Sequence, residues 1–539
     1  MAVVQIVFFA VVILFLATET KKAFGISNPH DRKLLSLLQP ILLIGVIARI
    51  IFLSHPEGVF VDGAIGGYDS WCLANYGVDS NLASYPVYLK SWGSGQSALY
   101  AYLALPFIKL FGLNIEAYRL PMSLIGCTAF LFFYYTLRKT QQNALLIFCL
   151  SAFVAINPWH IIKCRFALDC NIFPELLLIG MCFIILAYYS KSRLHQAFAY
   201  ITGFCIIAVS AYGYGISWFM LPVLYILLLW YLIRRRHITL KTSIVSIILS
   251  FVIVLPLILF AFLLVTDGEQ YQIGNITITA LTKGRHQVTT IFGSPDILTT
   301  LRTYLGSAFK MIILGMDPVP SNAHAIFPFG IFYNMLALPF LCVGLFAALK
   351  ERNPLNTIFL IWLVSCVFII LFVETNINHW NAVWFPVIYF AGYGIYQFSL
   401  KYIPNRVLFF SIFTILFIGF TYFYVTRYTF ADLQSQCEKE IKFAQSEGFD
   451  TVYYPDNIIH AYILFYVPID PYLYNTNKTD DGRPLAMVKT FANVKIGLPD
   501  NIVPRDKVAY VIPNKELVKL DLSGFNIKKG DYYSVLWSD

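Results

Sequence analysis

The sequence predicts an α-helical membrane protein with many transmembrane helices, followed by a small α/β domain at its C-terminus. Of the 539 residues, 58% are hydrophobic and only 13% are charged, whereas soluble domains carry about 25% charged residues. The mean hydropathy is +0.67. Long apolar runs recur as far as residue 426, after which the composition becomes mixed. Together these features indicate a chain embedded in a lipid bilayer.

Twelve apolar runs are long enough to be transmembrane helices, which must cover about 30 Å of hydrocarbon at about 1.5 Å per residue. They lie near residues 2–18, 34–53, 117–137, 143–158, 172–189, 197–215, 217–233, 242–266, 329–349, 355–373, 383–399 and 407–426. The segment 98–113 is also apolar, but it is short and contains Pro106 and Lys109. We therefore expect it to lie in the membrane interface.

The distribution of charge predicts the topology. With 98–113 not crossing, six connecting loops fall on one side and hold 16 Lys or Arg against three acids: 19–33, 138–142, 190–196, 234–241, 350–354 and 400–406. Such loops are typical of the cytoplasmic side. The loops 54–116, 158–171, 267–328 and 374–382 are then expected outside. The net charge of +9 follows from this topology, and we expect no nucleic-acid partner.

The last 110 residues have the pattern of a folded domain outside the membrane. The stretch "CEKEIKFAQSEGFDTVYYPDN" predicts an amphipathic helix followed by a strand. The stretches "KVAYVIPN" and "DYYSVLW" alternate as strands do. The expected organisation is a membrane module at 1–426 and an extracytoplasmic α/β domain at 427–539.

Charged residues at membrane depth are rare and usually functional, so the charged residues of each outer loop are candidates. The first outer loop contains several. The stretch "HPEGVFVDGAIGGYDSWCLANYGVD" (55–79) carries Asp62, Asp69 and Asp79 and no basic residue. Its glycines suggest a backbone that bends close to another group. Solvated loop acids beside an aromatic belt are the alternative interpretation.

The second outer loop, "NPWHIIKCRFALDCN" (157–171), contains His160, Lys163, Arg165 and Asp169. If it is helical, Arg165 and Asp169 are four residues apart on one face. They then form either a salt bridge that fixes a re-entrant turn or part of an anion site.

Two further loops contain candidate residues. Lys283 and Arg285 form a basic patch in "TKGRHQ", which suits either a lipid headgroup or a phosphate. The stretch "ETNINHWNAVWFP" places Asn378, His379 and Asn381 beside two tryptophans. Amides among flat rings are typical of a sugar-binding surface, but an aromatic belt with hydrogen-bonded amides fits equally well.

Taken together, residues 34–400 resemble the GT-C membrane glycosyltransferases, in particular bacterial relatives of the protein O-mannosyltransferase and lipid A aminoarabinose transferase group. The phrase "fG.n..a.RLp" of that group is matched by Phe111, Gly112, Asn114, Ala117 and Arg119–Pro121. The phrase "PWhi..sRfalD.n" is matched by Pro158–His160 and Arg165–Asp169. Where the group has Asp-Glu, this chain has Asp62-Gly63.

The resemblance implies an inverting transferase that takes a sugar from a polyprenyl-phosphate donor at the outer membrane face. The implied acceptor is a hydroxyl of a surface glycan, glycolipid or protein. Asp62 would be the base, Asp69 and Asp169 supporting acids, and a divalent metal is possible. The expected phosphate ligands are Lys163, Arg165, Lys283 and Arg285, and the expected substrate contacts are Tyr68, Trp92, His160, Asn378, His379 and Asn381.

Two other functions are compatible with a chain of this kind. A transporter or flippase of lipid-linked glycans would place ionisable residues at mid-membrane and often shows internal repeats. Here the candidate residues cluster in the outer loops, which favours chemistry at the surface. The third possibility is a non-catalytic membrane scaffold whose C-terminal domain recruits partners.

Overall fold

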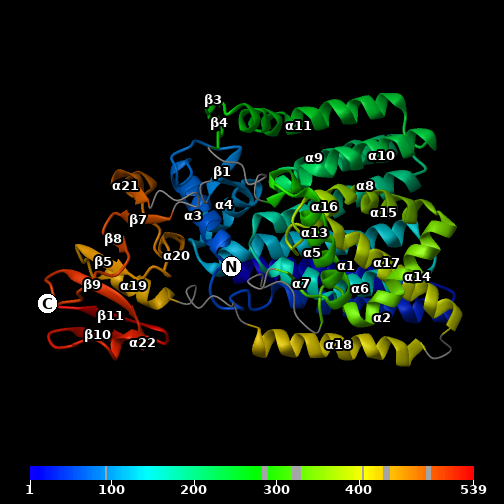
Figure 1. Cartoon of the computed structure of the whole chain (residues 1–539). Coiled ribbons are helices and arrows are strands. Elements are labelled where there is room, and N and C mark those ends of the chain that lie inside the picture. The colour runs from blue at the N-terminus through cyan, green and yellow to red at the C-terminus, as the bar shows by residue number, and fades with distance from the viewer. Residues whose placement is uncertain are drawn as a thin grey trace. The chain divides into compact units, whose positions relative to one another are not determined.

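The computed structural model describes residues 1–91, 94–281, 289–318, 329–402, 406–428, 437–480 and 487–538 (Figure 1). The chain divides into two compact units, each built from three separate stretches. We call them the helical unit (Met1–Leu53, Met122–Leu257 and Arg285–Tyr428) and the mixed unit (Ser54–Pro121, Ile258–Gly284 and Thr429–Asp539).

The helical unit contains most of the long helices. They are α1 (Ala2–Phe24), α2 (Pro29–Ile50), α5 (Ile115–Thr140), α6 (Ala144–Ala155), α7 (Pro158–Arg165), α8 (Asp169–Tyr189), α9 (Arg193–Ser210), α10 (Leu221–Arg234), α11 (Leu240–Thr266), α13 (Ile297–Leu314), α14 (Asn334–Glu351), α15 (Pro354–Ser365), α16 (Val367–Phe372), α17 (Asn381–Tyr402) and α18 (Arg406–Arg427), with 3-10 turns η1 (Gly215–Phe219) and η2 (Ile291–Gly293). The first turns of α5 and the last turns of α11 belong to the mixed unit.

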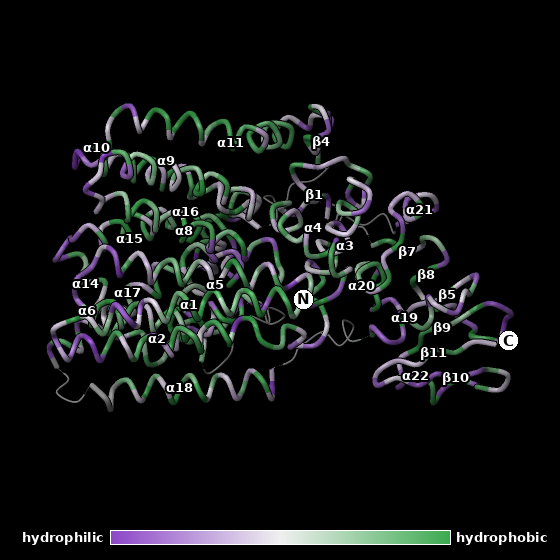
Figure 2. Tube along the Cα trace, turned by 180° about the vertical axis from the view of Figure 1, so that it is seen from behind, coloured by the Kyte–Doolittle hydropathy of each residue, from purple (hydrophilic) through white to green (hydrophobic). Residues whose placement is uncertain are grey.

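The composition of these helices confirms a multi-pass membrane protein. Within the described residues, nine helices are long and apolar enough to cross a bilayer, or ten if the bent pair α6–α7 counts as one span. Figure 2 shows α11 hydrophobic along most of its length. The predicted number of twelve spans stays a prediction.

The segment 267–328, interpreted above as an outer loop, contains a helix that the sequence pattern did not predict. α13 begins after Asp296, whose carboxylate accepts a hydrogen bond from the Thr299 N–H at 3.1 Å. It ends at Gly315, which adopts the left-handed conformation. Arg302 and Lys310 interrupt its apolar residues, and this is why the segment did not register as a span.

The mixed unit combines helices with three sheets. Its helices are α3 (Val61–Tyr76), α4 (Leu99–Phe111), α19 (Glu438–Ser446), α20 (His460–Tyr466), α21 (Pro471–Thr476) and α22 (Asn514–Leu517). Its strands are β1 (Tyr88–Ser91), β2 (Ser94–Ser97), β3 (Tyr271–Ile273), β4 (Ile276–Ile278), β5 (Thr451–Tyr454), β6 (Thr479–Asp480), β7 (Val488–Phe491), β8 (Val494–Ile496), β9 (Val508–Pro513), β10 (Asn526–Lys529) and β11 (Tyr533–Trp537).

The C-terminal strands form a seven-stranded sheet in the order β10-β11-β9-β5-β8-β7-β6. β5 runs parallel to both β8 and β9, while the other neighbouring pairs are antiparallel. Tyr510, Ile512 and Leu536 belong to a buried core cluster of this sheet. The predicted α/β character of this region is confirmed, including the helix (α19) followed by a strand (β5).

The first outer segment is more regular than the sequence suggested, because the expected glycine-rich bend is the first half of helix α3. Gly66 and Gly67 permit close packing rather than a turn. A Cβ atom at Gly66 would lie 2.6 Å from the Tyr118 hydroxyl, and one at Gly67 would lie 2.6 Å from the Phe465 ring. α4 follows with 13 residues, too few to span a bilayer. Its location in the membrane interface stays a prediction.

Candidate functional site

Asp62 lies in the first turn of α3 and its side chain is half-buried. Peptide dipoles favour a carboxylate at a helix N-terminus. The backbone carbonyl of Asp62 accepts a hydrogen bond from Nε2 of Gln96 at 3.3 Å, which joins the start of α3 to β2. The predicted base therefore lies in the first turn of a helix whose start is hydrogen-bonded to β2.

Arg119, in α5, holds the turn that leads into this helix. Its side chain is buried, and its two terminal nitrogens donate to the carbonyl oxygens of Pro56 at 2.9 Å and Gly58 at 2.7 Å. A buried guanidinium is stable only when its donors are paired. The arginine of the "RLP" phrase thus fixes the chain a few residues before Asp62.

Asp69 and Asp79 form a second acidic feature of the mixed unit. Both side chains are fully buried. Asp69 accepts a hydrogen bond from the Ser80 N–H at 2.9 Å, and Asp79 accepts from Asn81 at 2.9 Å and Ala83 at 2.8 Å. Burial and the charge of Asp79 raise the pKa of Asp69 to about 7. Asp69 is two turns from Asp62, about 10 Å along the helix axis, so it does not occupy the place of the missing glutamate.

In the helical unit, the start of α17 meets the α7–α8 connection in a buried polar cluster. The ammonium group of Lys163 donates to the side-chain oxygens of Asn171, at 2.9 Å, and of Asn378. Asn381 donates to the Cys170 carbonyl at 2.9 Å. The structure thus brings together Lys163, Asn378 and Asn381, three predicted site residues from two separate loops.

Arg165 makes the contacts of a helix cap. Its guanidinium donates to the carbonyl oxygens of Ala48 at 3.1 Å, of Ile51 at 2.6 Å and of Phe52, and its Nε donates to the Tyr424 hydroxyl at 3.1 Å. These carbonyls lie at the C-terminal end of α2, where backbone acceptors have no partner within the helix. The phosphate-binding role predicted for Arg165 stays a prediction.

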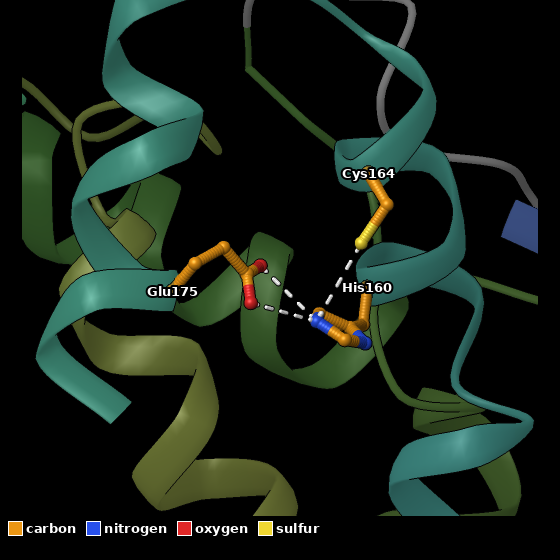
Figure 3. A group of neighbouring side chains, drawn as sticks. All are labelled: His160, Cys164 and Glu175. Atoms are coloured by element: carbon orange, nitrogen blue, oxygen red, sulfur yellow. Dashed lines mark hydrogen bonds and ion pairs between the residues drawn. The ribbon is translucent and has the colours of Figure 1, made fainter. Parts of the chain in front are cut away.

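His160 lies in the core of the helical unit, and Figure 3 shows its imidazole facing Glu175 and Cys164. On its other side it contacts Arg49. Nη2 of Arg49 is 2.7 Å from Nδ1 of His160, and Nε2 of His160 is 3.1 Å from the Glu175 carboxylate. Arginine can only donate. Nδ1 is therefore an acceptor, and Nε2 carries the proton that it donates to Glu175.

The same cluster is the one group of metal-binding residue types found among the described residues. Ligand atoms of His160, Cys164 and Glu175 lie within 4.8 Å of one another, a set of donors that zinc accepts. A metal would need the lone pair of Nε2, but the Arg49 contact requires a proton on that nitrogen. In this arrangement the residues do not fit a metal, and we assign no step to one.

Comparison with solved structures identifies the fold. The apo structure of ArnT from Cupriavidus metallidurans matches with a TM-score of 0.56 and 11% identity over 93% of this chain and 97% of that chain. The structure of the same protein bound to undecaprenyl phosphate gives 0.55. The chain has the GT-C fold. A third match is the Archaeoglobus fulgidus oligosaccharyltransferase in complex with Zn and sulfate, with a TM-score of 0.50 and 14% identity over 80% of this chain and 61% of that one.

No family model matches the sequence, and no curated protein matches it either. The structural match to ArnT nevertheless confirms, at the level of the fold, the GT-C resemblance that was inferred from two short phrases. Both phrases have structural roles here: Arg119 fixes the turn before α3, and Arg165 caps α2.

The remaining predicted site residues of this GT-C fold lie in several places. Asp169 is the first residue of α8, and its carboxylate accepts from the Cys170 N–H at 2.8 Å. His379 packs within its own loop, where Nδ1 lies 2.7 Å from the Glu374 carbonyl oxygen. Tyr68 is buried in the mixed unit and donates to the Ile469 carbonyl at 2.6 Å. Trp92, Lys283 and Arg285 lie outside the described residues.

Sequence reasoning missed Arg49 and Glu175, which lie in α2 and α8. Each is an ionisable residue inside an apolar run, and this is itself a signal of a buried partner. It also missed that Lys163 pairs with Asn171, because an asparagine eight residues away gives no periodic signal.

Proposed function

We propose that this chain is a membrane glycosyltransferase that moves a sugar from a polyprenyl-phosphate donor to an acceptor hydroxyl on a cell-surface glycan, glycolipid or protein. The observation that carries the proposal is the GT-C fold shared with ArnT along nearly the full length of both chains. One of the matched ArnT structures holds undecaprenyl phosphate. The reacting groups are proposed to face outward, as the charge asymmetry of the loops predicts.

In the proposed reaction Asp62 is the general base. Its carboxylate takes the proton of the acceptor hydroxyl while the hydroxyl oxygen forms a bond to the anomeric carbon. The bond from that carbon to the phosphate oxygen breaks, and the polyprenyl phosphate leaves with the bonding electrons. Attack opposite to the leaving group inverts the anomeric centre.

The leaving phosphate needs positive charge as its own charge develops. We assign this role to Lys163, whose ammonium is held by the Asn171 and Asn378 oxygens. An ammonium has three donors, so these two bonds leave a third for a phosphate oxygen. Arg165 remains the second proposed phosphate ligand, and its donors also hold the end of α2.

The test compares the surface glycans of a strain that lacks this chain with those of the same strain carrying the wild type or Asp62→Asn. We expect the wild type to restore one sugar substituent and Asp62→Asn to lower it about 100-fold or more, the range for loss of a general base. Glu57→Gln is the matched control, because Glu57 is an exposed acid five residues earlier. Mass spectrometry of the glycans would name the sugar and the acceptor.

Two results would contradict the proposal. Full restoration by Asp62→Asn at equal expression would remove Asp62 from the mechanism. Identical glycans in the parent and the deleted strain would argue against transferase activity as a whole.

A further inference from the structure

The mixed unit contains a cleft that the proposed mechanism does not use. Its volume is about 240 Å³, and its walls come from α3, the β1–β2 hairpin, the chain after β4, and the C-terminal segment from α20 to β7. Pockets for drug-sized ligands measure about 300–1,000 Å³. This cleft therefore suits a smaller group, such as a single sugar residue.

Hydroxyl and amide groups line one side of the cleft. They come from Ser80, Asn81, Ser91 and Ser94. The Ser91 hydroxyl is buried and has no hydrogen-bond partner among the described residues. Burying a hydroxyl without a partner costs free energy. A ligand hydroxyl that reaches Ser91 would remove this cost.

Two lysines give the cleft a positive charge. The ammonium of Lys90 donates to the neutral side chain of Gln270 at 2.8 Å, and that of Lys478 reaches Asn81 only at 3.4 Å. Neither lysine forms an ion pair within the described part of the chain. Lys478 is half-buried, so water screens its charge only in part.

Three acids near the cleft act against this charge. Asp480 lines the cleft but is exposed, so its charge is screened by water. Asp79 acts on both Lys90 and Lys478, and Asp69 acts on Lys478. Burial lowers the pKa of Lys478, while burial and the charge of Asp79 raise the pKa of Asp69 to about 7, so the two buried acids carry less than two full negative charges at neutral pH. Burial lowers the pKa of His460 to about 4, so this imidazole is neutral and adds no charge of its own.

Two tyrosines supply an aromatic wall. Tyr68 and Tyr474 line the cleft, and their rings meet edge to face at 5.8 Å. The Lys478 ammonium lies 4.9 Å from the centre of the Tyr474 ring. Aromatic faces bind the C–H faces of sugars, while hydroxyl and amide groups bind sugar hydroxyls. The lining thus combines surfaces for a sugar ring with positive charge for an acid group.

We propose that this cleft binds one sugar residue that carries an acidic substituent, either a carboxylate or a phosphate. Lys478 and Lys90 would hold the acid group, and Ser91 with Asn81 would hold ring hydroxyls. Its assignment as a subsite for the acceptor glycan rests on the proposed function, whereas binding of the acidic sugar does not.

The test uses the full-length protein in lipid nanodiscs and three probes: glucose, glucuronate and glucose 6-phosphate. Binding is measured by saturation-transfer NMR and by calorimetric titration. We expect at least one acidic sugar to bind about tenfold or more tightly than glucose, because charge-assisted hydrogen bonds exceed neutral ones. The comparison of glucuronate with glucose 6-phosphate then shows which acid group the cleft prefers.

Substitutions of lining residues test whether the acidic sugar binds in the cleft. Lys478→Met and, independently, Ser91→Ala should weaken binding of the preferred acidic sugar, the lysine variant by about tenfold. Lys439→Met is the matched control, because it removes an exposed lysine of the same unit. The inference is overturned if glucose binds as tightly as both acidic sugars, if none of the three binds, or if Lys478→Met, shown to be folded by its melting curve, binds like the wild type.

Asp62→Asn separates this inference from the proposed function. It should bind the acidic sugar like the wild type, because Asp62 is not part of the lining. If Asp62→Asn loses sugar transfer but still binds the acidic sugar, the result supports both the proposed function and the binding site. Intact binding in a chain without transferase activity would overturn the proposed function and leave the binding site in place.

Discussion

Asp69 and Asp79 are two buried carboxylates of the mixed unit, and burial together with the negative charge of Asp79 raises the pKa of Asp69. Each binds backbone N–H groups through one oxygen, and the second oxygen of each has no hydrogen-bond partner among the described residues. Two such groups cannot both be ionised without cost. Burial raises the pKa of both carboxyls, and that of Asp69 reaches about 7.

The pair should make the stability of the protein depend on pH. The folded pKa of Asp69 is about 7, above the ordinary value of 3.8, so the native state binds more protons than the unfolded state between these limits. Stability therefore falls as pH rises from about 4 to about 7. We expect Asp69→Asn to raise the melting temperature relative to the wild type, increasingly so toward pH 7, in melting curves recorded across this range.

Asp521→Asn is a control for which we expect the opposite dependence of stability on pH. Asp521 is exposed and accepts a hydrogen bond from the Ser523 N–H at 3.0 Å, which lowers its pKa. Its contribution is present at neutral pH and is lost as pH falls through its folded pKa. If the melting temperatures of the wild type and of Asp69→Asn changed with pH in the same way, Asp69 would not titrate as proposed.

Arg119 should matter for activity although we do not expect it to contact the reacting atoms. Arg119→Met would leave the Pro56 and Gly58 carbonyls without their donor, at a cost of about 1–3 kcal/mol for each buried group. We expect a lower melting temperature and a loss of kcat larger than the change in KM, because the position of Asp62 is disturbed. Arg119→Lys should recover stability more than activity, since one ammonium replaces a two-pronged donor.

Gly66 should not tolerate a methyl group. In Gly66→Ala the new Cβ would lie 2.6 Å from the Tyr118 hydroxyl, and overpacking of this kind costs about 1–3 kcal/mol. Tyr118→Phe removes the clashing oxygen, so the double variant should regain part of the lost melting temperature. Gly306→Ala in α13 is the control, since nothing lies within 4 Å of its Cβ position. Additive effects of the two changes at 66 and 118 would contradict the packing argument.

A metal chelator should not affect the His160 cluster, because we expect no metal to bind there. Because Arg49 donates to Nδ1 of His160, the other ring nitrogen keeps its proton and does not bind a metal. We therefore expect the zinc content and the effect of EDTA on the melting temperature to be the same in the wild type and in Cys164→Ser. Stoichiometric zinc that disappears in Cys164→Ser would show that the cluster binds a metal.

Much of the helical unit could be predicted because its signal is local. The apolar runs at 34–53 and 242–266 correspond to α2 and α11 within a few residues. α3 was not predicted, because glycines are poor helix formers and three of them lie within its first seven residues. Its helix is stabilised by Tyr118 and Phe465, which are distant in the sequence. Tertiary packing of this kind leaves no periodic pattern.

The candidate site residues also divide into those that the sequence indicated and those that only the fold revealed. Asp62 and Lys163 could be singled out from their residue types and from the family phrases. The partners of Lys163 could not, because Asn378 lies 215 positions further along the chain. Arg165 was expected to face a phosphate, yet its present contacts are carbonyl oxygens at the end of α2. Sequence alone identifies a cation, but only the fold shows what it touches.

The mixed unit is assembled from the second, fourth and last of the alternating stretches of chain, and this has a consequence for synthesis. Phe465, which packs against Gly67, is translated almost four hundred residues after it. Helix α3, which carries Asp62 in its first turn, must therefore wait without its partner until the ribosome has nearly finished the chain. A nascent protein stopped after α18 would be a membrane bundle in which the helix of the proposed base lacks its support, so we expect removal of the C-terminal segment to abolish the proposed activity even if that segment never touches a substrate.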